Sequence, residues 1–180
     1  MAYYYLVASL VPLTLEGDVS FTPGEFFESC KNMLDSQDRR DMEYVINDQP
    51  EFARHPFVRK WRQSEIHLKN ALVAARTARF HIDARPFLKD DAEIGINEAK
   101  VAAEALGKQN PLEKELALDK YRWRVLDELA SADFFGMSSI FSFVLKLKLI
   151  MRWKSLNDEK GRDVVEKLFE RKSKEICYGM

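Results

Sequence analysis

The side chains best suited to metal binding or acid–base chemistry are three histidines and two cysteines. The histidines, His55, His67 and His81, are separated by 12 and 14 residues. Zinc sites usually pair their ligands at short spacing, as in Cys-x-x-Cys or His-Glu-x-x-His, and neither pattern occurs in this chain. With Cys30 and Cys177 as the only cysteines, we predict no metal site, no disulfide framework and two reduced thiols in a cytosolic protein.

Motifs for nucleotide binding and for nucleophilic catalysis are also missing from the sequence. The chain has no Gly-x-Gly-x-x-Gly, no phosphate loop ending in Gly-Lys-Ser/Thr and no Gly-x-Ser-x-Gly elbow. Its many acidic residues fall mainly on the surfaces of predicted helices, where a solvated face is their ordinary role. We therefore predict a protein that is not an enzyme and that uses no cofactor.

Charge is unevenly distributed along the chain, although the net charge is −1. Residues 1–53 hold 3 basic and 10 acidic side chains, whereas residues 54–89 hold 9 basic and 2 acidic ones. Two interpretations follow: the acidic third neutralises the basic segment internally, or the basic segment binds an anionic partner. Phe57 and Trp61 beside these cations could stack on nucleic acid, but Trp61 also fits a core stripe, and the pI of about 6.3 opposes a dedicated nucleic-acid binder.

Several short sequence signals position the elements, and all of them indicate helices. Thr22-Pro23-Gly24-Glu25 and Asn110-Pro111-Leu112-Glu113 are capping boxes with proline at the first helical position. Ser36 and Asn97 are further candidate caps, and Gly107 is a candidate helix terminator. Together with the apolar periodicity, these signals predict an all-α bundle of about seven helices, near 23–34, 36–46, 57–84, 98–106, 111–130, 134–153 and 157–176. We expect a single domain over 1–180, with a possible subdivision near 84–97 into 1–84 and 97–180.

The long helix predicted after Pro56 is apolar on two sides. One stripe at helical spacing contains Phe57, Trp61, Leu68, Leu72 and Ala75. A second stripe contains Ile66, Val73 and Phe80, and between the stripes a basic residue recurs at every seventh position: Arg62, Lys69 and Arg76. Such a helix is either sandwiched between neighbours or in contact with a partner, so these three cations are candidate partner contacts.

The two most apolar stretches are poor candidates for membrane spans. The opening run ends after about 12 residues, short of the roughly 20 that a bilayer requires, and it lacks the basic region of a secretory signal. The segment 134–153 is longer, but it contains Lys146, Lys148 and Arg152, each costly near a bilayer centre. We predict a buried helix with a basic end, with an interfacial helix as the alternative, and we count these cations among the candidate partner contacts.

Two regions carry a resemblance to a known family. The first is Tyr3-Tyr4-Tyr5-Leu6-Val7-Ala8-Ser9-Leu10 with Pro12, followed by Thr22-Pro23-Gly24-Glu25-Phe26-Phe27. The second, in the carboxyl half, contains Leu112-Glu113-Lys114-Glu115-Leu116, Leu118-Asp119-Lys120-Tyr121 and Leu147-Lys148-Leu149-Ile150-Met151-Arg152. In these stretches the chain resembles an uncharacterised bacterial family associated with operons for V-type (V/A-type) ATPases. That family is in turn similar to the C subunit of those machines, which is called d in eukaryotes and is referred to below as the C/d component.

The resemblance implies a non-catalytic part built of helical repeats, in which a Tyr-rich N-terminal helix precedes the repeated units. The C/d component is a socket between the membrane rotor ring and the central stalk, so the ring and stalk are the implied partners. The implied location is the cytoplasm, at the cytoplasmic face of the membrane when assembled. The chain is shorter than a full C/d component with three repeats, which leaves open a reduced version or an assembly factor.

The residues of the opening run are candidate contacts in this interpretation. Tyr3, Tyr4 and Tyr5 could meet a partner, and at least part of them should pack against a later helix. The main alternative is a freestanding helical adaptor whose segment 54–89 binds an anionic protein or nucleic acid. No nucleic-acid partner is favoured, and we expect no insertion into the membrane.

Overall fold

The structure, a computed structural model, describes residues 3–89 and 94–156, and every regular element within those ranges is a helix. The predicted all-α class is confirmed. The helix predicted from Asn157 and the second cysteine, Cys177, lie outside the described residues. The α-helices of the described residues are α1 (Tyr4–Ala8), α2 (Pro23–Cys30), α3 (Ser36–Ile46), α4 (Pro56–Phe80), α5 (Ile96–Gly107), α6 (Pro111–Ser131) and α7 (Met137–Ser155). Three short 3₁₀ turns join them: Lys31–Met33, Pro50–Phe52 and Arg85–Phe87.

Both predicted capping boxes coincide with helix starts; the one at α2 forms both of its hydrogen bonds, whereas α6 is capped by the side chain of Asn110 alone. At α2 the hydroxyl of Thr22 accepts from the N–H of Glu25 at 3.2 Å, and the carboxylate of Glu25 accepts from the N–H of Thr22 at 2.7 Å. At α6 the side chain of Asn110 accepts from the N–H of Leu112 at 2.9 Å. Each cap satisfies N–H groups that the helix itself cannot, which explains why these boundaries are visible in the sequence.

Other helix boundaries differ from the predicted ones. Asp35, one residue before Ser36, caps α3 by accepting from two backbone N–H groups. At α5 the cap position is Gly95, so Asn97 lies inside the helix. The helix also retains Gly107, and its cap residue has extended backbone angles, not the left-handed ones expected of a glycine terminator.

The two longest predicted helices also have shifted ends. α4 stops at Phe80 and not near Ala84, because His81 adopts the left-handed conformation with φ of 55°. α7 begins at Met137, so Phe134 and Phe135 belong to the connection that precedes it. This second difference has a consequence for the surface, because it moves two aromatic rings out of a helix and onto a turn.

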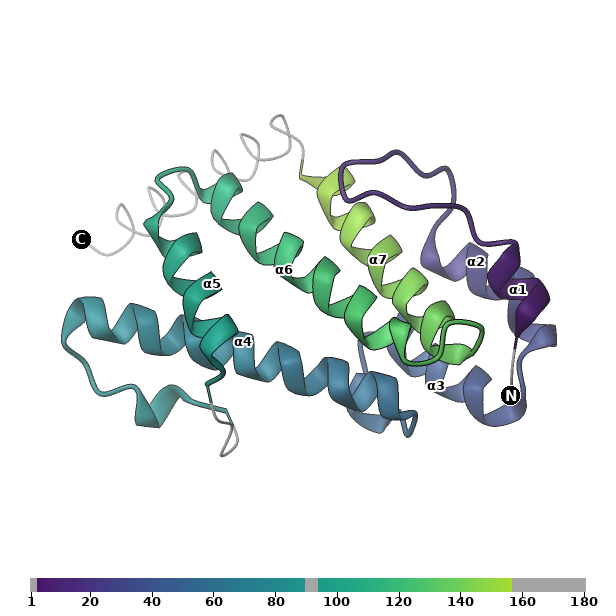
Figure 1. The fold of residues 1–180 in the computed structure, drawn as a ribbon, viewed down its shortest axis with the longest axis horizontal. Helices are drawn as coiled ribbons and strands as arrows, with labels where there is room; N and C mark the ends of the chain where they lie inside the picture. The colour runs from purple at the N-terminus through teal and green to yellow at the C-terminus, as the bar shows by residue number, and fades with distance from the viewer. Residues whose placement is uncertain (1–2, 90–93, 157–180) are drawn as a thin grey trace, which may run out of the picture.

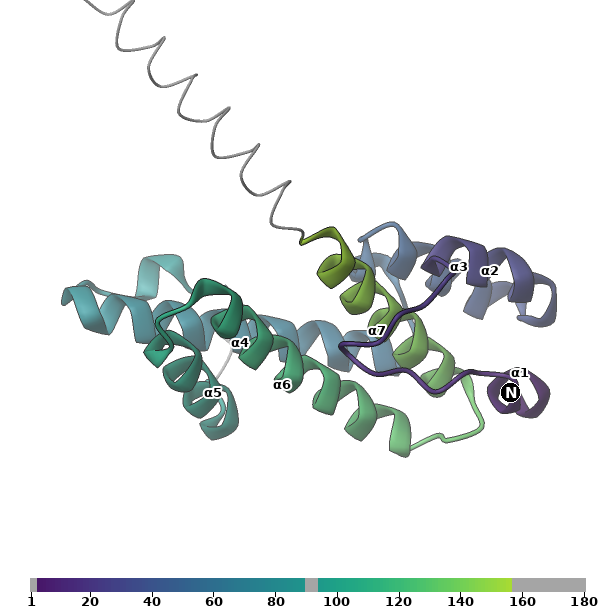
Figure 2. The same ribbon diagram turned by 90° about the horizontal axis from the view of Figure 1, so that it is seen from above.

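The helices form an elongated bundle in which α6 is central (Figure 1). α6 packs against α4, α5 and α7, while α2 and α3 pack on the other flank of α7. Figure 2 shows the same arrangement from above, with α1, α2 and α3 at one end and the C-terminal end of α4 at the other. One hydrophobic cluster contains residues from both sides of the 84–97 segment, from Met42 and Leu68 to Leu126 and Phe141.

The side chains of the two apolar stripes of α4 differ in how far they are buried. Of the first stripe, Phe57, Trp61, Leu68 and Leu72 are buried and Ala75 is half-buried. Of the second, Ile66 and Val73 are only half-buried and Phe80 is 71% exposed. The first stripe is therefore in the core and the second is only partly covered; beside the second, Asn70 is buried and exchanges hydrogen bonds with the backbone of Lys89 in the segment that follows the helix. None of the helices in the described ranges is long and apolar enough to cross a membrane.

Candidate functional site

The histidines do not converge. Along α4 they are separated by about 18 Å and about 21 Å at 1.5 Å per residue. The described residues include no group of three or more His, Cys, Asp or Glu side chains that could hold a metal ion. His55 caps the start of α4, where its Nδ1 accepts from the N–H of Phe57 at 3.2 Å. His81 is the C-cap residue of the same helix.

His55 and Tyr3 belong to a polar cluster that joins the N-terminus to α3 and α4. The hydroxyl of Tyr3 donates to Oδ2 of Asp38 at 2.6 Å, and Asp41 accepts from the backbone N–H groups of Arg54 and His55. Burial raises the pKa of Asp38, and burial lowers the pKa of His55 despite the opposing pull of nearby carboxylates. Tyr3 is thus a buried structural residue and is not free for a partner.

The cap made by neutral His55 predicts acid sensitivity. Because its folded pKa lies below the unfolded value of about 6.5, His55 contributes stability above that value and loses it as pH falls toward the folded pKa. Protonation would also remove the lone pair that accepts from Phe57. Urea titrations at pH of about 7.5 and about 5 should show a stability loss in the wild type, and the loss should shrink in His55→Asn, which can cap without titrating.

The raised pKa of Asp38 acts in the opposite direction, since its protonation favours the fold as pH decreases.

His81→Asn, at the exposed C-terminal end of α4, is the matched control and should keep the wild-type pH response. An unchanged response in His55→Asn would contradict this assignment.

The other two tyrosines of the opening run are exposed and belong to α1, which lies at one end of the bundle (Figure 1). Tyr5 is 94% exposed and Tyr4 is 60% exposed, and Tyr4 packs on Phe135 with ring centroids 5.2 Å apart. Phe134 is 66% exposed and meets Phe135 edge-on at 5.0 Å. We call these four residues, Tyr4, Tyr5, Phe134 and Phe135, the aromatic end.

The backbone around the aromatic end is held by a hydrogen bond between two distant segments of the chain. The N–H of Tyr3 donates to the carbonyl of Phe135 at 2.7 Å, which ties α1 to the α6–α7 connection. An open groove of about 380 Å³ adjoins it, with Val7, Val11 and Phe134 among its lining residues. Sequence reasoning missed Phe134 and Phe135 because it placed them in a helix. Gly136 was the available signal, since glycine directly after two aromatic residues is an unfavourable helix-interior choice.

The basic row of α4 remains exposed. Arg62, Lys69 and Arg76 are all on the surface, and none has a carboxylate within 4 Å among residues 3–89 and 94–156. In the same ranges, the one cation of segment 54–89 that forms an ion pair is Arg85, with its neighbour Asp83. Two acidic residues of the N-terminal third pair with cations of α7, Asp18 with Lys154 and Asp48 with Lys148, although Asp48 and Glu51 also lie along the same hollow as Arg62 and Lys69. Ion pairing with that third therefore does not neutralise the basic row.

Two adjoining hollows follow this side of α4, and we call them together the basic groove. Their volumes are about 640 and about 600 Å³, and they share Pro50, Glu51, Arg62 and Ile66. Five cations line them: Arg59, Lys60, Arg62, Lys69 and Lys89. Phe57 is buried, and Trp61 lines the second hollow with only 8% of its surface exposed, so little of either ring is available to stack on a ligand in the groove.

The cations of α7 have internal partners, which the sequence did not predict. Lys146 pairs with Asp127 and lies 4.8 Å from the centre of the Trp123 ring. Lys148 donates to the carbonyl of Val45 at 2.8 Å, at the end of α3, where a cation suits the helix dipole. Arg152 pairs with two acidic residues of α6. Because α7 packs against α3 and α6, these side chains stabilise helix contacts inside the bundle.

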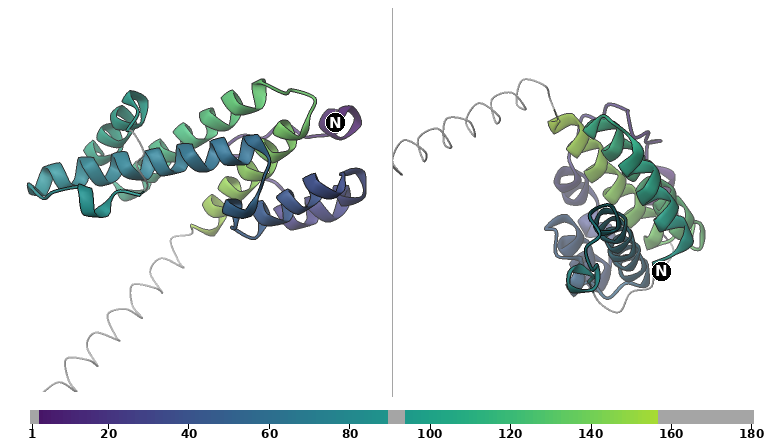
Figure 3. Two further views of the ribbon diagram at one scale, coloured as in Figure 1. Left: turned by 90° about the horizontal axis from the view of Figure 1, so that it is seen from below. Right: turned by 90° about the vertical axis from the view of Figure 1, so that its left-hand side faces the viewer.

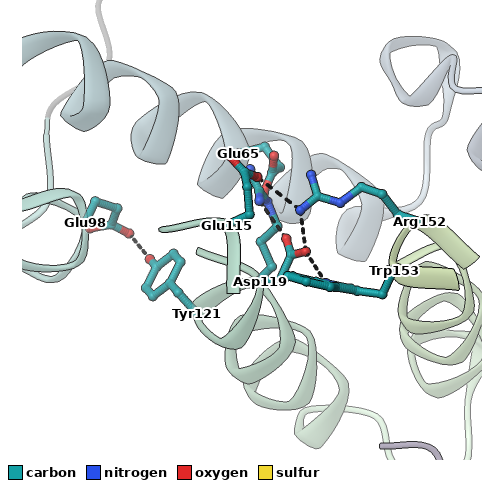
Figure 4. A network of polar contacts seen from close by, with 8 residues as sticks. Glu65, Glu98, Glu115, Asp119, Tyr121, Arg152 and Trp153 are labelled. Carbon is teal, nitrogen blue, oxygen red and sulfur yellow. Dashed lines mark hydrogen bonds and ion pairs between the residues drawn. The ribbon is translucent and has the colours of Figure 1, made fainter. Parts of the chain in front are cut away.

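Asp119, a buried acid on α6, organises a polar network (Figure 4). Its Oδ1 accepts from Arg122 at 2.7 Å, and its Oδ2 accepts from Arg152 and from Nε1 of Trp153, the latter at 2.8 Å. Arg122 also donates to Glu65 of α4 at 2.8 Å. Burial alone would lower the pKa of Arg122, but Glu65 and Asp119 outweigh it and raise that pKa. The network links α4, α6 and α7.

Comparison with known proteins finds similarity in the C-terminal half of the chain. A protein-family model described as "Protein of unknown function (DUF2764)" matches residues 96–176. The matched part includes α5, α6 and α7, with Asp119 and Phe134, and excludes α4 and the tyrosines of the opening run. Searches of curated proteins and of solved structures found no match to the chain.

Proposed function

We propose that this protein is a non-catalytic structural or assembly component of a V-type ATPase, which helps to connect the central stalk to the membrane rotor ring. It docks on those parts at the cytoplasmic face of the membrane. The observation that carries the proposal is the aromatic end. Two of the tyrosines on which the family resemblance rests are displayed to solvent, beside Phe134 and Phe135, on a support fixed by a buried third tyrosine.

The physical form of the aromatic end favours protein docking. Tyrosine and phenylalanine supply large contact area at low conformational cost, and aromatic residues are enriched at the energetic centres of interfaces. Tyr3 is bonded to Asp38, and Tyr4 is packed on Phe135, so much of the surface is ordered before a partner arrives. Preorganisation of this kind lowers the cost of association.

Capture of the tagged chain from its native cells tests the proposal. The wild type should recover stalk or ring proteins of the V-type ATPase. A double variant, Tyr5→Ser with Phe134→Ser, should recover at least about tenfold less, because each ring lost from an interface centre costs about 2 kcal/mol. Both rings are exposed, so the fold should survive their removal.

A matched control removes equally exposed apolar side chains from other places on the surface. Ile82→Ser with Leu112→Ser should recover the same ATPase proteins as the wild type, since both residues are exposed and Ile82 follows α4, whose C-terminal end lies at the opposite end of the bundle from α1 (Figure 2). Recovery of no ATPase protein by the wild-type chain would refute the proposed function.

One observation favours a second candidate, a freestanding adaptor that binds an anionic partner through segment 54–89. The basic groove lacks ion-pair neutralisation by the N-terminal third within the described residues. Salt-sensitive retention on nucleic acid without any ATPase protein would support this candidate over the first, since phosphate contacts weaken steeply as salt concentration rises.

A further inference from the structure

The exposed side of α4 has the spacing of a coiled-coil seam. Its residues are Arg62, Ile66, Lys69, Val73, Arg76 and Phe80, at alternating intervals of four and three. Intervals of four and three keep a row of side chains on one face of a helix, and they define the contact line between paired helices. The basic residues occupy one heptad series and the apolar residues the other. We call these six residues the α4 seam; it extends for about 27 Å along the helix.

The α4 seam is accessible. Its three cations are exposed, Ile66 and Val73 are half-buried, and Phe80 is largely exposed. Seen from below, α4 lies in front of α6 and α7 (Figure 3, left). The basic groove adjoins the first half of the seam and contains Arg62, Ile66 and Lys69. A contact line of this length, with a hollow beside it, suits another helix.

We propose that the α4 seam binds an amphipathic α-helix of a partner protein, with apolar residues facing Ile66, Val73 and Phe80 and acidic residues facing Arg62, Lys69 and Arg76. The proposal rests on the docking role proposed above and names the chemistry of a second contact. Helix-in-groove recognition lays the apolar face of an amphipathic helix along an apolar line, and Ile66, Val73 and Phe80 supply one such residue in every two turns of α4. Acidic residues of the partner placed opposite Arg62, Lys69 and Arg76 would complement these cations. The same cations would repel a helix that carries basic residues at those positions.

The excess of basic over acidic side chains in the basic groove favours an acidic partner. Three acids line the groove along with its five cations. Two of these acids already have internal partners, Asp48 with Lys148 and Glu65 with Arg122. Glu51 is the remaining acid, and Lys89 adds a cation beside Lys69. The field along this side of α4 is therefore positive.

A second copy of the chain fits this seam poorly. Parallel pairing would place the basic series of one copy opposite that of the other, and antiparallel pairing would press cations against apolar residues. Either arrangement is unfavourable for charges without partners. Nucleic acid also fits poorly, because half of the seam is apolar and the aromatic residues among its first cations, Phe57 and Trp61, are buried.

The test uses the purified full chain and a synthetic helical peptide of three heptads. Leucine occupies the peptide positions that would face Ile66, Val73 and Phe80. Glutamate occupies the positions that would face the three cations of the seam. Fluorescence anisotropy should show binding that weakens as NaCl rises from about 50 mM to about 500 mM. A scrambled peptide of the same composition should bind at least about tenfold more weakly, because it lacks the seam. Equal binding of the two peptides would overturn the proposal in favour of diffuse attraction.

Variants of the chain locate the contact. The charge reversal Arg62→Glu, Lys69→Glu and Arg76→Glu should weaken binding of the acidic peptide at least about tenfold and create binding to a peptide with lysine at those positions. Val73→Ser with Phe80→Ser should also weaken it. The control reversal Arg40→Glu, Lys100→Glu and Lys120→Glu changes the net charge equally at exposed positions and should leave binding intact.

Three outcomes overturn the proposal: unchanged binding in the triple reversal, tighter binding of a single-stranded RNA than of the peptide, or self-association of the wild type that the reversal abolishes. These results are separable from those of the capture experiment. Recovery of ATPase proteins by a chain whose seam binds no acidic helix would leave the proposed function standing and remove only this inference.

Discussion

Replacing Asp119 with alanine should destabilise the fold by about 3–5 kcal/mol, because it removes one partner from a buried ion network. Asp119 is fully buried and accepts from Arg122, Arg152 and Trp153. Arg122 is only 13% exposed, so after the substitution its charge would stay in the interior with Glu65 as its remaining acidic partner. Urea unfolding followed by far-ultraviolet circular dichroism measures the loss.

Two further variants show whether charge or shape is responsible. Asp119→Asn keeps the size of the side chain but turns an amide NH₂ group toward a guanidinium, so it should lose a large part of the same stability. Glu115→Ala removes the half-exposed acid that also pairs with Arg152, and it should cost less than about 1 kcal/mol. An Asp119→Ala protein within about 1 kcal/mol of wild type would contradict the role assigned to the network.

Phe141→Ala should destabilise the fold by about 3–5 kcal/mol through the cavity it leaves. The Phe141 ring is fully buried on α7 and packs 4.9 Å from the ring of His55 and 6.0 Å from that of Phe57, both at the start of α4. Such a loss is a large share of the roughly 5–15 kcal/mol that stabilises an ordinary domain. Thermal and urea unfolding should both show it.

Substitutions that differ in size test the cavity explanation. Phe141→Leu fills most of the space and should cost less than about 1.5 kcal/mol if the neighbours adjust. Phe52→Ala removes an exposed ring that packs on Tyr44, and it should change stability by less than about 1 kcal/mol. If Phe141→Ala were no worse than Phe52→Ala, the placement of Phe141 in the core would be refuted.

The sequence was most informative where structure is determined locally. The caps at Thr22 and Asn110 involve groups two or three residues apart, so the pattern alone predicted the starts of α2 and α6. At α3 the prediction chose Ser36, whereas the neighbouring Asp35 caps the helix; both residue types suit the cap position, so local chemistry does not decide between them. The core stripe of α4 was predicted for a similar reason, since helical spacing alone assigns its residues to one face.

Contacts between distant segments could not be predicted. Lys148 and Asp48 are 100 residues apart, and Arg152 and Asp119 are 33 apart, so their pairing depends on how the helices cross. The charge totals suggested that the acidic third could neutralise segment 54–89, but totals do not say which side chains meet. In the opening run, three identical residues gave no sign that Tyr3 is buried while Tyr5 is free.

The most direct test of the central claim is isolation of the V-type ATPase itself, through a tag on one of its own stalk proteins, from cells that make this chain at its native level. We expect the chain in the purified complex at a fixed ratio to the stalk, and at least about tenfold less of the Tyr5→Ser, Phe134→Ser variant. Isolation of assembly intermediates should recover it in the same way if it acts during assembly. Absence of the wild-type chain from both the intact complex and its intermediates would contradict the account.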